Sequence, residues 1–190
     1  MNARSAACAA LLVAATATAC SSGEPAPRVT VTQTVTATPS TEAAANPDTG
    51  VLKMGTKKAN DDDASNIHTT IQAVEYQQPY KGPQPRKPAD FQGGDIWATA
   101  SVKVCNIRGS DITVDQSVWS LAYEDGTRIQ ITGDTGGDMP KPEYPMATVV
   151  KPGRCAAGLI AFPVPSKKRP ARLVYGPQGS TPIEWAIPKA

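Results

Sequence analysis

Alternating apolar and polar residues dominate the pattern of the chain from about Asn66 onward. In this region no window shows a sustained apolar period of 3.6 residues, whereas a period of two residues, typical of strands, recurs several times. Fourteen prolines between Pro79 and Pro188 also disfavour helices of ordinary length, because proline lacks the amide donor that an interior helical position needs. We therefore predict an all-β domain over residues 66–190.

The alternation predicts about seven short strands. The clearest runs from Ile96 to Val104, with small and β-branched apolar residues on its even-numbered face. Another pair of strands is separated by Asp125 and Gly126, which have the composition of a hairpin turn. The expected strands cover residues 67–75, 96–105, 119–123, 128–131, 158–164, 171–175 and 183–187. This number of strands with turn signals between them favours a two-layer sandwich whose core holds the aromatic residues, with Trp97 as the possible exception.

Residues 1–19 differ from the rest and have the outline of a signal peptide. Arg4 is followed by an unbroken small and apolar run, which as a helix would rise only about 21 Å and is too short for a membrane span. The sequence ATAC at 17–20 resembles the lipobox of bacterial lipoproteins, with Ala17 where leucine is usual. We expect acyl chains on Cys20, which becomes the first residue of the mature protein. The alternative is ordinary cleavage at the same place, which leaves a secreted protein.

Residues 20–65 are expected to form a lipidated cysteine followed by a disordered linker rich in Thr, Ala and Pro. All ten aromatic residues lie between Tyr76 and Trp185, so this segment has little apolar area to bury. Residues 29–36, VTVTQTVT, alternate like a strand. Because an isolated strand of this length is not stable, we expect extended coil there unless the segment finds a partner.

Composition excludes several classes of function. Without residues 1–19 the chain has 18 basic and 17 acidic side chains, so its net charge is close to zero. Non-specific binding of nucleic acid needs a clustered positive charge, which this balance does not favour. His68 is the only histidine, so a multi-histidine metal site is excluded and a histidine-based catalytic triad is disfavoured. No G-x-S-x-G motif is present. We therefore expect no enzyme activity and no cofactor.

Three segments carry a resemblance to a known family. They are IWATASVKVCN at 96–106, WSLAYEDG at 119–126, and the KPG at 151–153 that leads into GLIAFPVP at 158–165. This order resembles a family of secreted and lipid-anchored bacterial proteins, common in actinobacteria, similar to the mycobacterial immunoprotective extracellular protein. The resemblance covers residues 66–190. It implies an immunoglobulin-like two-sheet sandwich of unknown function and supplies no catalytic residues.

Cys105 and Cys155 are the cysteines that remain once Cys8 leaves with the signal peptide and Cys20 is acylated. An even pair in an exported chain predicts a disulfide. Both residues have odd numbers, opposite in parity to the apolar faces of their strands, so we expect the bond on the outer surface of one sheet. A redox-active pair is the alternative, although the C-x-x-C context is missing.

The basic cluster of the domain is Lys167, Lys168, Arg169 and Arg172, a possible contact surface for anionic headgroups or envelope polymers. An ordinary surface loop is the alternative interpretation. Together the observations predict a lipid-anchored, extracytoplasmic binding module. Its loops at one end of the sandwich would meet an envelope protein or glycan. The alternative is an envelope carrier of a small ligand or metal ion, for which Met139 and Met146 are the available support.

Overall fold

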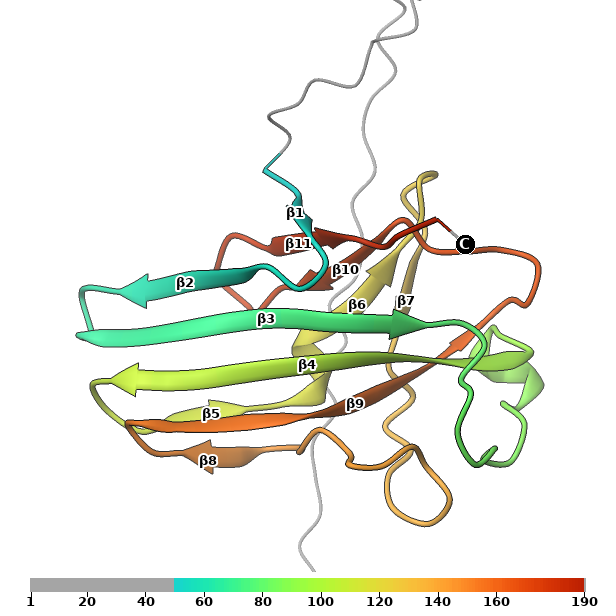
Figure 1. Cartoon of the computed structure of the whole chain (residues 1–190), viewed down its shortest axis with the longest axis horizontal. Helices are drawn as coiled ribbons and strands as arrows, with labels where there is room; N and C mark the ends of the chain where they lie inside the picture. The colour runs from blue at the N-terminus through green and yellow to red at the C-terminus, as the bar shows by residue number, and fades with distance from the viewer. Residues whose placement is uncertain (1–49, 190) are drawn as a thin grey trace, which may run out of the picture. The chain divides into compact units, whose positions relative to one another are not determined.

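The structure, a computed structural model, describes residues 50–189 (Figure 1). The predicted signal peptide, Cys20 and the strand-like segment at 29–36 lie outside the described residues.

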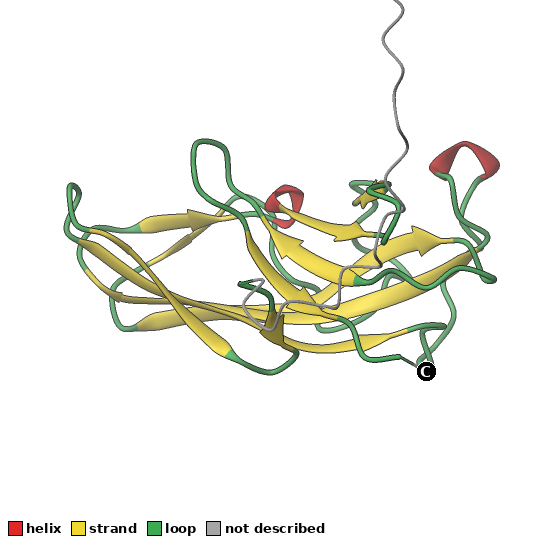
Figure 2. Cartoon of the chain, turned by 90° about the horizontal axis from the view of Figure 1, so that it is seen from above, coloured by secondary structure: helices red, strands yellow, loops and turns green. Residues whose placement is uncertain are grey.

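In the described residues, eleven strands form three sheets. They are β1 (Leu52–Lys53), β2 (Lys57–Asp62), β3 (Ile67–Gln77), β4 (Ile96–Arg108), β5 (Ile112–Val114), β6 (Trp119–Ala122), β7 (Arg128–Gln130), β8 (Thr148–Val150), β9 (Arg154–Val164), β10 (Arg172–Tyr175) and β11 (Ile183–Ala186). The larger sheets have the orders β1-β11-β10-β6-β7 and β2-β3-β4-β9, and β5 pairs with β8 in a small third sheet. Pairing is antiparallel except between β1 and β11. The strands lie in layers joined by loops (Figure 2), so the predicted all-β sandwich is confirmed.

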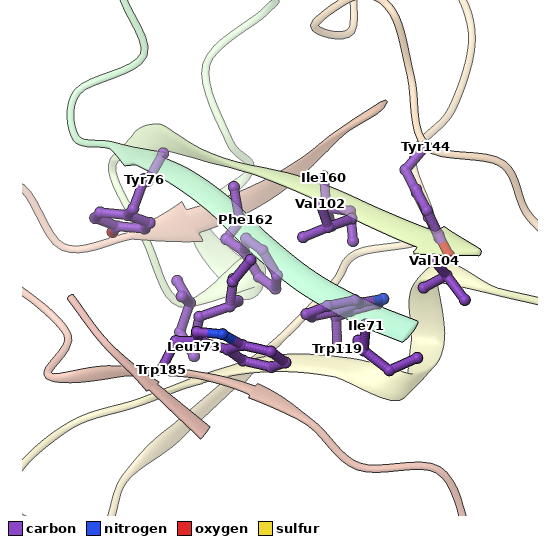
Figure 3. Close-up of a cluster of buried hydrophobic side chains, with 14 of the residues drawn as sticks. Ile71, Tyr76, Val102, Val104, Trp119, Tyr144, Ile160, Phe162, Leu173 and Trp185 are labelled. Atoms are coloured by element: carbon purple, nitrogen blue, oxygen red, sulfur yellow. The ribbon is translucent and has the colours of Figure 1, made fainter. Parts of the chain in front are cut away.

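One core fills the space between the two larger sheets (Figure 3). On β4 the even-numbered residues from Ala98 to Val104 are at most 1% exposed, as their alternation predicts. Ile160 and Phe162 of β9 continue this inner face. The facing sheet contributes fully buried residues from β6, β10 and β11, namely Trp119, Leu121, Leu173 and Trp185. Apolar burial on both inner faces is the main stabilising contribution to the sandwich.

The predicted boundary between linker and domain at residue 66 is wrong. β1 and β2 precede it, and β2 pairs with β3 over six residues, from Lys57 opposite Gln72 to Asp62 opposite Ile67. Most of the β2 side chains are exposed and polar, so the strand is held by its backbone pairing and shows no apolar alternation. Residues 52–65 therefore belong to the folded domain, and the acidic run at 61–63 belongs to β2 and its turn.

Residues 142–144 cross the outer edge of β9. Leu159 N donates to Pro142 O at 2.7 Å, and Tyr144 N donates to Leu159 O at 2.9 Å. Gly158 makes this approach possible, because a Cβ there would collide with the backbone of Tyr144. The edge of the four-stranded sheet is therefore covered at this point.

The long connection between β3 and β4, residues 78–95, folds back against the start of β4. Tyr80 N donates to Trp97 O at 2.8 Å, and Asp95 N donates to Val164 O at 3.1 Å. This connection carries the short 3-10 helix η1 (Asp90–Gln92) and holds it beside the end of β9. In Figure 1 this end of the sandwich lies at the right, where the chain leaves β3 and β9.

Candidate interaction surface

Cys105 and Cys155 form the predicted disulfide. They lie directly opposite each other on β4 and β9, with their Cα atoms 4.0 Å apart. Their odd parity places the bond on the outer face of the four-stranded sheet, as expected. The register runs from Ile96 opposite Val164 to Asn106 opposite Arg154, so the bond lies at the far end of these strands from η1.

The four basic residues follow β9, and two of them pair with carboxylates of the domain. Lys168 Nζ lies 2.6 Å from Asp125 Oδ2 and 4.5 Å from the ring centroid of Tyr123. Arg169 Nε donates to the carbonyl of Pro188 at 2.9 Å.

The guanidinium of Arg172 lies 2.8 Å from Glu184 Oε2. Lys167 is exposed. Three of the four cations are thus engaged by the protein's own oxygens, which weakens the case for the cluster as a contact surface.

The ion pair between Lys168 and Asp125 gives a direct electrostatic prediction. Hydrogen bonds from Lys168 and from Thr127 lower the pKa of Asp125 from its ordinary 3.8 to about 2. We expect Lys168→Ala to raise this pKa towards 3.8, as measured by an NMR pH titration of the Asp125 side chain. Because the folded-state pKa is lowered, the contribution of Asp125 to stability is present above about pH 4 and is lost as the pH falls towards 2. An unchanged pKa in Lys168→Ala would contradict the pairing.

Two clefts flank η1, and Gln92 lines both of them. The first has a volume of about 330 Å³ and lies between the 85–92 segment and the loop at 134–139. The second has a volume of about 500 Å³ and lies between residues 91–93 and β7 with its flanking residues. Gln92 Nε2 donates to Asp134 Oδ2 at 2.8 Å, which joins the two loops where the clefts meet.

Side-chain hydrogen bonds fix η1 in this position. Gln92 Oε1 accepts from Ala89 N at 2.7 Å and closes the turn. Ser166 donates its amide and its hydroxyl to the Asp95 carboxylate at 2.5 and 2.7 Å, which ties the connection to the chain after β9. These bonds from Ser166 also lower the pKa of Asp95. The clefts are therefore lined by a connection that hydrogen bonds fix to the rest of the domain.

Phe91 is the functional candidate that the sequence analysis missed. It was expected in the core with the other aromatic residues, but its side chain is 89% exposed. The parity argument applies to strands, whereas Phe91 lies on η1, outside any alternating run. Trp97, the possible exception, is 4% exposed because the 80–89 segment covers it, and its Nε1 donates to Arg86 O at 2.7 Å.

The family model described as "Domain of unknown function (DUF4352)" matches residues 29–183. The chain belongs to this family. Two solved structures share the DUF4352 chain's fold. The secreted protein MPT63 from Mycobacterium tuberculosis is 17% identical, with a TM-score of 0.56, over 75% of this chain and 99% of its own. The yjhA protein from Bacillus subtilis is 13% identical, with a TM-score of 0.50, over 73% of this chain and 100% of its own.

These comparisons confirm the resemblance to the mycobacterial family and its immunoglobulin-like fold. No curated protein shows significant sequence similarity to the chain. None of the helices in the described part of the DUF4352 chain has the length and apolar content of a membrane span.

The carrier alternative rests on metal-ligating and thioether side chains, and the structure gives the positions of those in the described residues. Across residues 50–189 no group of three or more His, Cys, Asp or Glu side chains is placed to hold a metal ion. His68 Nδ1 lies 3.1 Å from Asp61 Oδ1, across the β2–β3 pair. Met139 and Met146 line different clefts, so the two thioethers are not gathered in one.

Proposed function

We propose that this DUF4352 chain is a lipid-anchored envelope protein whose domain is a non-catalytic, extracytoplasmic interaction module. Cys20 directly after a small and apolar leader supports the anchor. Two or three acyl chains, at about 0.8 kcal/mol per buried methylene, suffice for stable attachment to a bilayer. The disulfide between Cys105 and Cys155 supports an oxidising location outside the cytoplasm.

The observation that carries the interaction role is the exposure of Phe91. A phenyl ring that is 89% exposed leaves apolar area in water, and this one stands at the wall of the second cleft. Aromatic side chains beside a pocket are the usual anchors of protein interfaces. We infer that the η1 surface, comprising residues 91–93 and the two clefts, meets an envelope protein or glycan.

We expect Cys20→Ser to move the protein from the membrane fraction to the medium, or to leave it as an uncut precursor. Loss of the thiol removes the acyl chains that hold the protein on the bilayer. Labelling with a palmitate analogue and the mass of the N-terminal peptide measure the modification. Ser22→Ala is the matched control and retains anchoring. An unmodified mature start in the wild type would refute the anchor and leave a secreted domain.

We expect Phe91→Ser to abolish in-cell cross-linking of the domain to its envelope partner while leaving its stability within about 0.5 kcal/mol. Val74→Ser is the matched control, since Val74 is 43% exposed on β3, away from η1. Cross-linked species resolved by mass are compared among the three proteins. Equal cross-linking of the wild type and Phe91→Ser would show that the η1 surface is not the contact.

A further inference from the structure

β2 is an edge strand of the four-stranded sheet, and one of its sides has no partner strand among the described residues. It pairs with β3 and is the first strand in the order of its sheet. Within residues 50–189, no backbone hydrogen bond joins β2 to a segment other than β3. A cleft of about 210 Å³ lies between residues 58–60 and residues 181–183. The loop before β11 therefore leaves this edge open.

The side chains of β2 are exposed on both faces of the sheet. Five of the six are exposed and the sixth, Asn60, is half-buried. Lys58 is exposed although it lies opposite Ile71, a core residue, and so shares the inner face of the sheet. Figure 1 shows β2 and β3 running past β11 at the left. The edge therefore has room for a further strand.

The main-chain groups of β2 alternate in direction. Thr69 Oγ1 on β3 donates to Asn60 O at 2.6 Å, so the carbonyl of Asn60 points towards β3. Because direction changes from one residue to the next along an antiparallel strand, the N–H and C=O groups of Ala59 and Asp61 point away from β3. These groups can pair with a second strand.

The charges of β2 are separated by sign. Lys57 and Lys58 begin the strand, whereas Asp61 and Asp62 end it and Asp63 follows. Charges on an edge strand usually oppose pairing with other chains. Here they oppose a copy of β2 that runs in the same direction, because like charges would then be neighbours. A copy that runs in the opposite direction brings lysines beside aspartates, which favours pairing.

We propose that two copies of the chain pair along β2 in antiparallel orientation and join their four-stranded sheets into one. A two-fold axis perpendicular to the sheet relates the copies, as in other isologous dimers. In the register with Asn60 opposite its own copy, outward main-chain groups meet each other and each lysine of one copy lies opposite an aspartate of the other. The facing residues are Ala59 and Asp61, Lys58 and Asp62, and Lys57 and Asp63.

The dimer should be weak and sensitive to salt. One added strand buries less than the about 1,200 Å² at the low end of stable interfaces. Ion pairs at an exposed edge are screened, so the dissociation constant should rise with salt concentration. The proposed anchor at Cys20 would raise the local concentration of the chains on a membrane. This last consequence rests on the proposed function, but the pairing itself does not, and it is tested on unlipidated protein.

The test is the mass in solution, over a range of concentrations, of the chain from residue 20 onward with Cys20→Ser. We expect a reversible equilibrium between monomer and dimer. Lys57→Glu/Lys58→Glu should weaken the dimer at least about thirtyfold, because every ion pair becomes a contact between like charges. Lys151→Glu/Lys167→Glu is the matched control and should retain the dimer. It changes the net charge equally, at exposed positions before and after β9, the opposite edge strand of the sheet.

A complementary variant separates charge matching from damage to the fold. Asp62→Lys/Asp63→Lys alone should be monomeric, because lysine would meet lysine in the dimer. Mixed with Lys57→Glu/Lys58→Glu, it should form heterodimers, since every facing charge pair is then opposite in sign. A mixture that does not associate would overturn the proposal. A parent chain that remains monomeric at about 1 mM would overturn it as well.

Oxidative cross-linking tests the register. Asn60→Cys places two thiols at a pair whose main-chain groups point away from the other copy, where the Cα atoms are about 4.5 Å apart and a disulfide fits. In Lys57→Cys the two thiols would be about 20 Å apart along the strands. We expect Asn60→Cys to cross-link at least about tenfold faster. Equal rates for the two variants would indicate random collision and contradict the pairing.

Discussion

Trp185→Ala is expected to lower the free energy of unfolding by about 4–5 kcal/mol, a large part of the stability of a domain of this size. Trp185 is fully buried on β11, and its ring centroid lies 5.9 Å from that of Trp119 (Figure 3). Its Nε1 donates to Thr56 O at 2.8 Å, which ties β11 to the turn between β1 and β2. The substitution therefore opens a cavity and leaves a carbonyl without its donor. Chemical denaturation followed by circular dichroism measures the change.

Trp185→Phe separates the two contributions. It keeps an aromatic ring in the core but removes the donor to Thr56 O, so we expect a loss of about 2 kcal/mol. Val149→Ala, at a position 58% exposed on β8, controls for truncation outside the core and should change stability by less than about 0.5 kcal/mol. Equal stability of Trp185→Ala and Val149→Ala would contradict the description of the core.

The strands predicted from the sequence are those with a buried face. In β4 and β9 the alternation is strong because every second side chain enters the core, and this is visible without a structure. β2 is the opposite case, since its pairing with β3 is made by the backbone and its side chains remain in water. The three-residue strands β5 and β8 are too short to show a period. β7 is equally short but was predicted, because the turn at Asp125 and Gly126 precedes it. Strands that are short or exposed and lack such a turn signal therefore escaped prediction.

The candidate site was harder to predict because it depends on contacts between distant residues. Gln92 and Asp134 are 42 positions apart, and their hydrogen bond joins the loops at the two clefts. The charges of a cluster can be counted in a sequence, but the acidic residues that pair with them cannot be identified there. Lys168, for example, pairs with Asp125, which is 43 positions away. Phe91 gave no signal because its exposure follows from how residues 78–95 fold back. The cysteine pair was predictable, because two cysteines remain once Cys8 and Cys20 are assigned to the leader and the anchor, and their parity places both on one face.

The second large effect concerns that cysteine pair. We expect Cys105→Ala/Cys155→Ala to lower the free energy of unfolding by about 4 kcal/mol in the loop-entropy account. The two residues are 50 positions apart, and the chain between them carries β5, β6, β7 and β8. Without the bond, the unfolded chain gains the freedom of this whole loop, while β4 and β9 keep their ladder. The melting temperature should fall by about 10–15 °C, measured by thermal unfolding.

Reduction of the wild-type disulfide is the matched control, because Cys105 is only 7% exposed and its replacement also removes buried sulfur. A thiol reductant keeps both sulfur atoms and breaks only the bond between them. If the cross-link itself is responsible, the reduced wild type and the double variant should melt within a few degrees of each other. If the reduced and the oxidised wild type had the same melting temperature, the entropic account would be contradicted. The loss in the double variant would then be assigned to packing around Cys105.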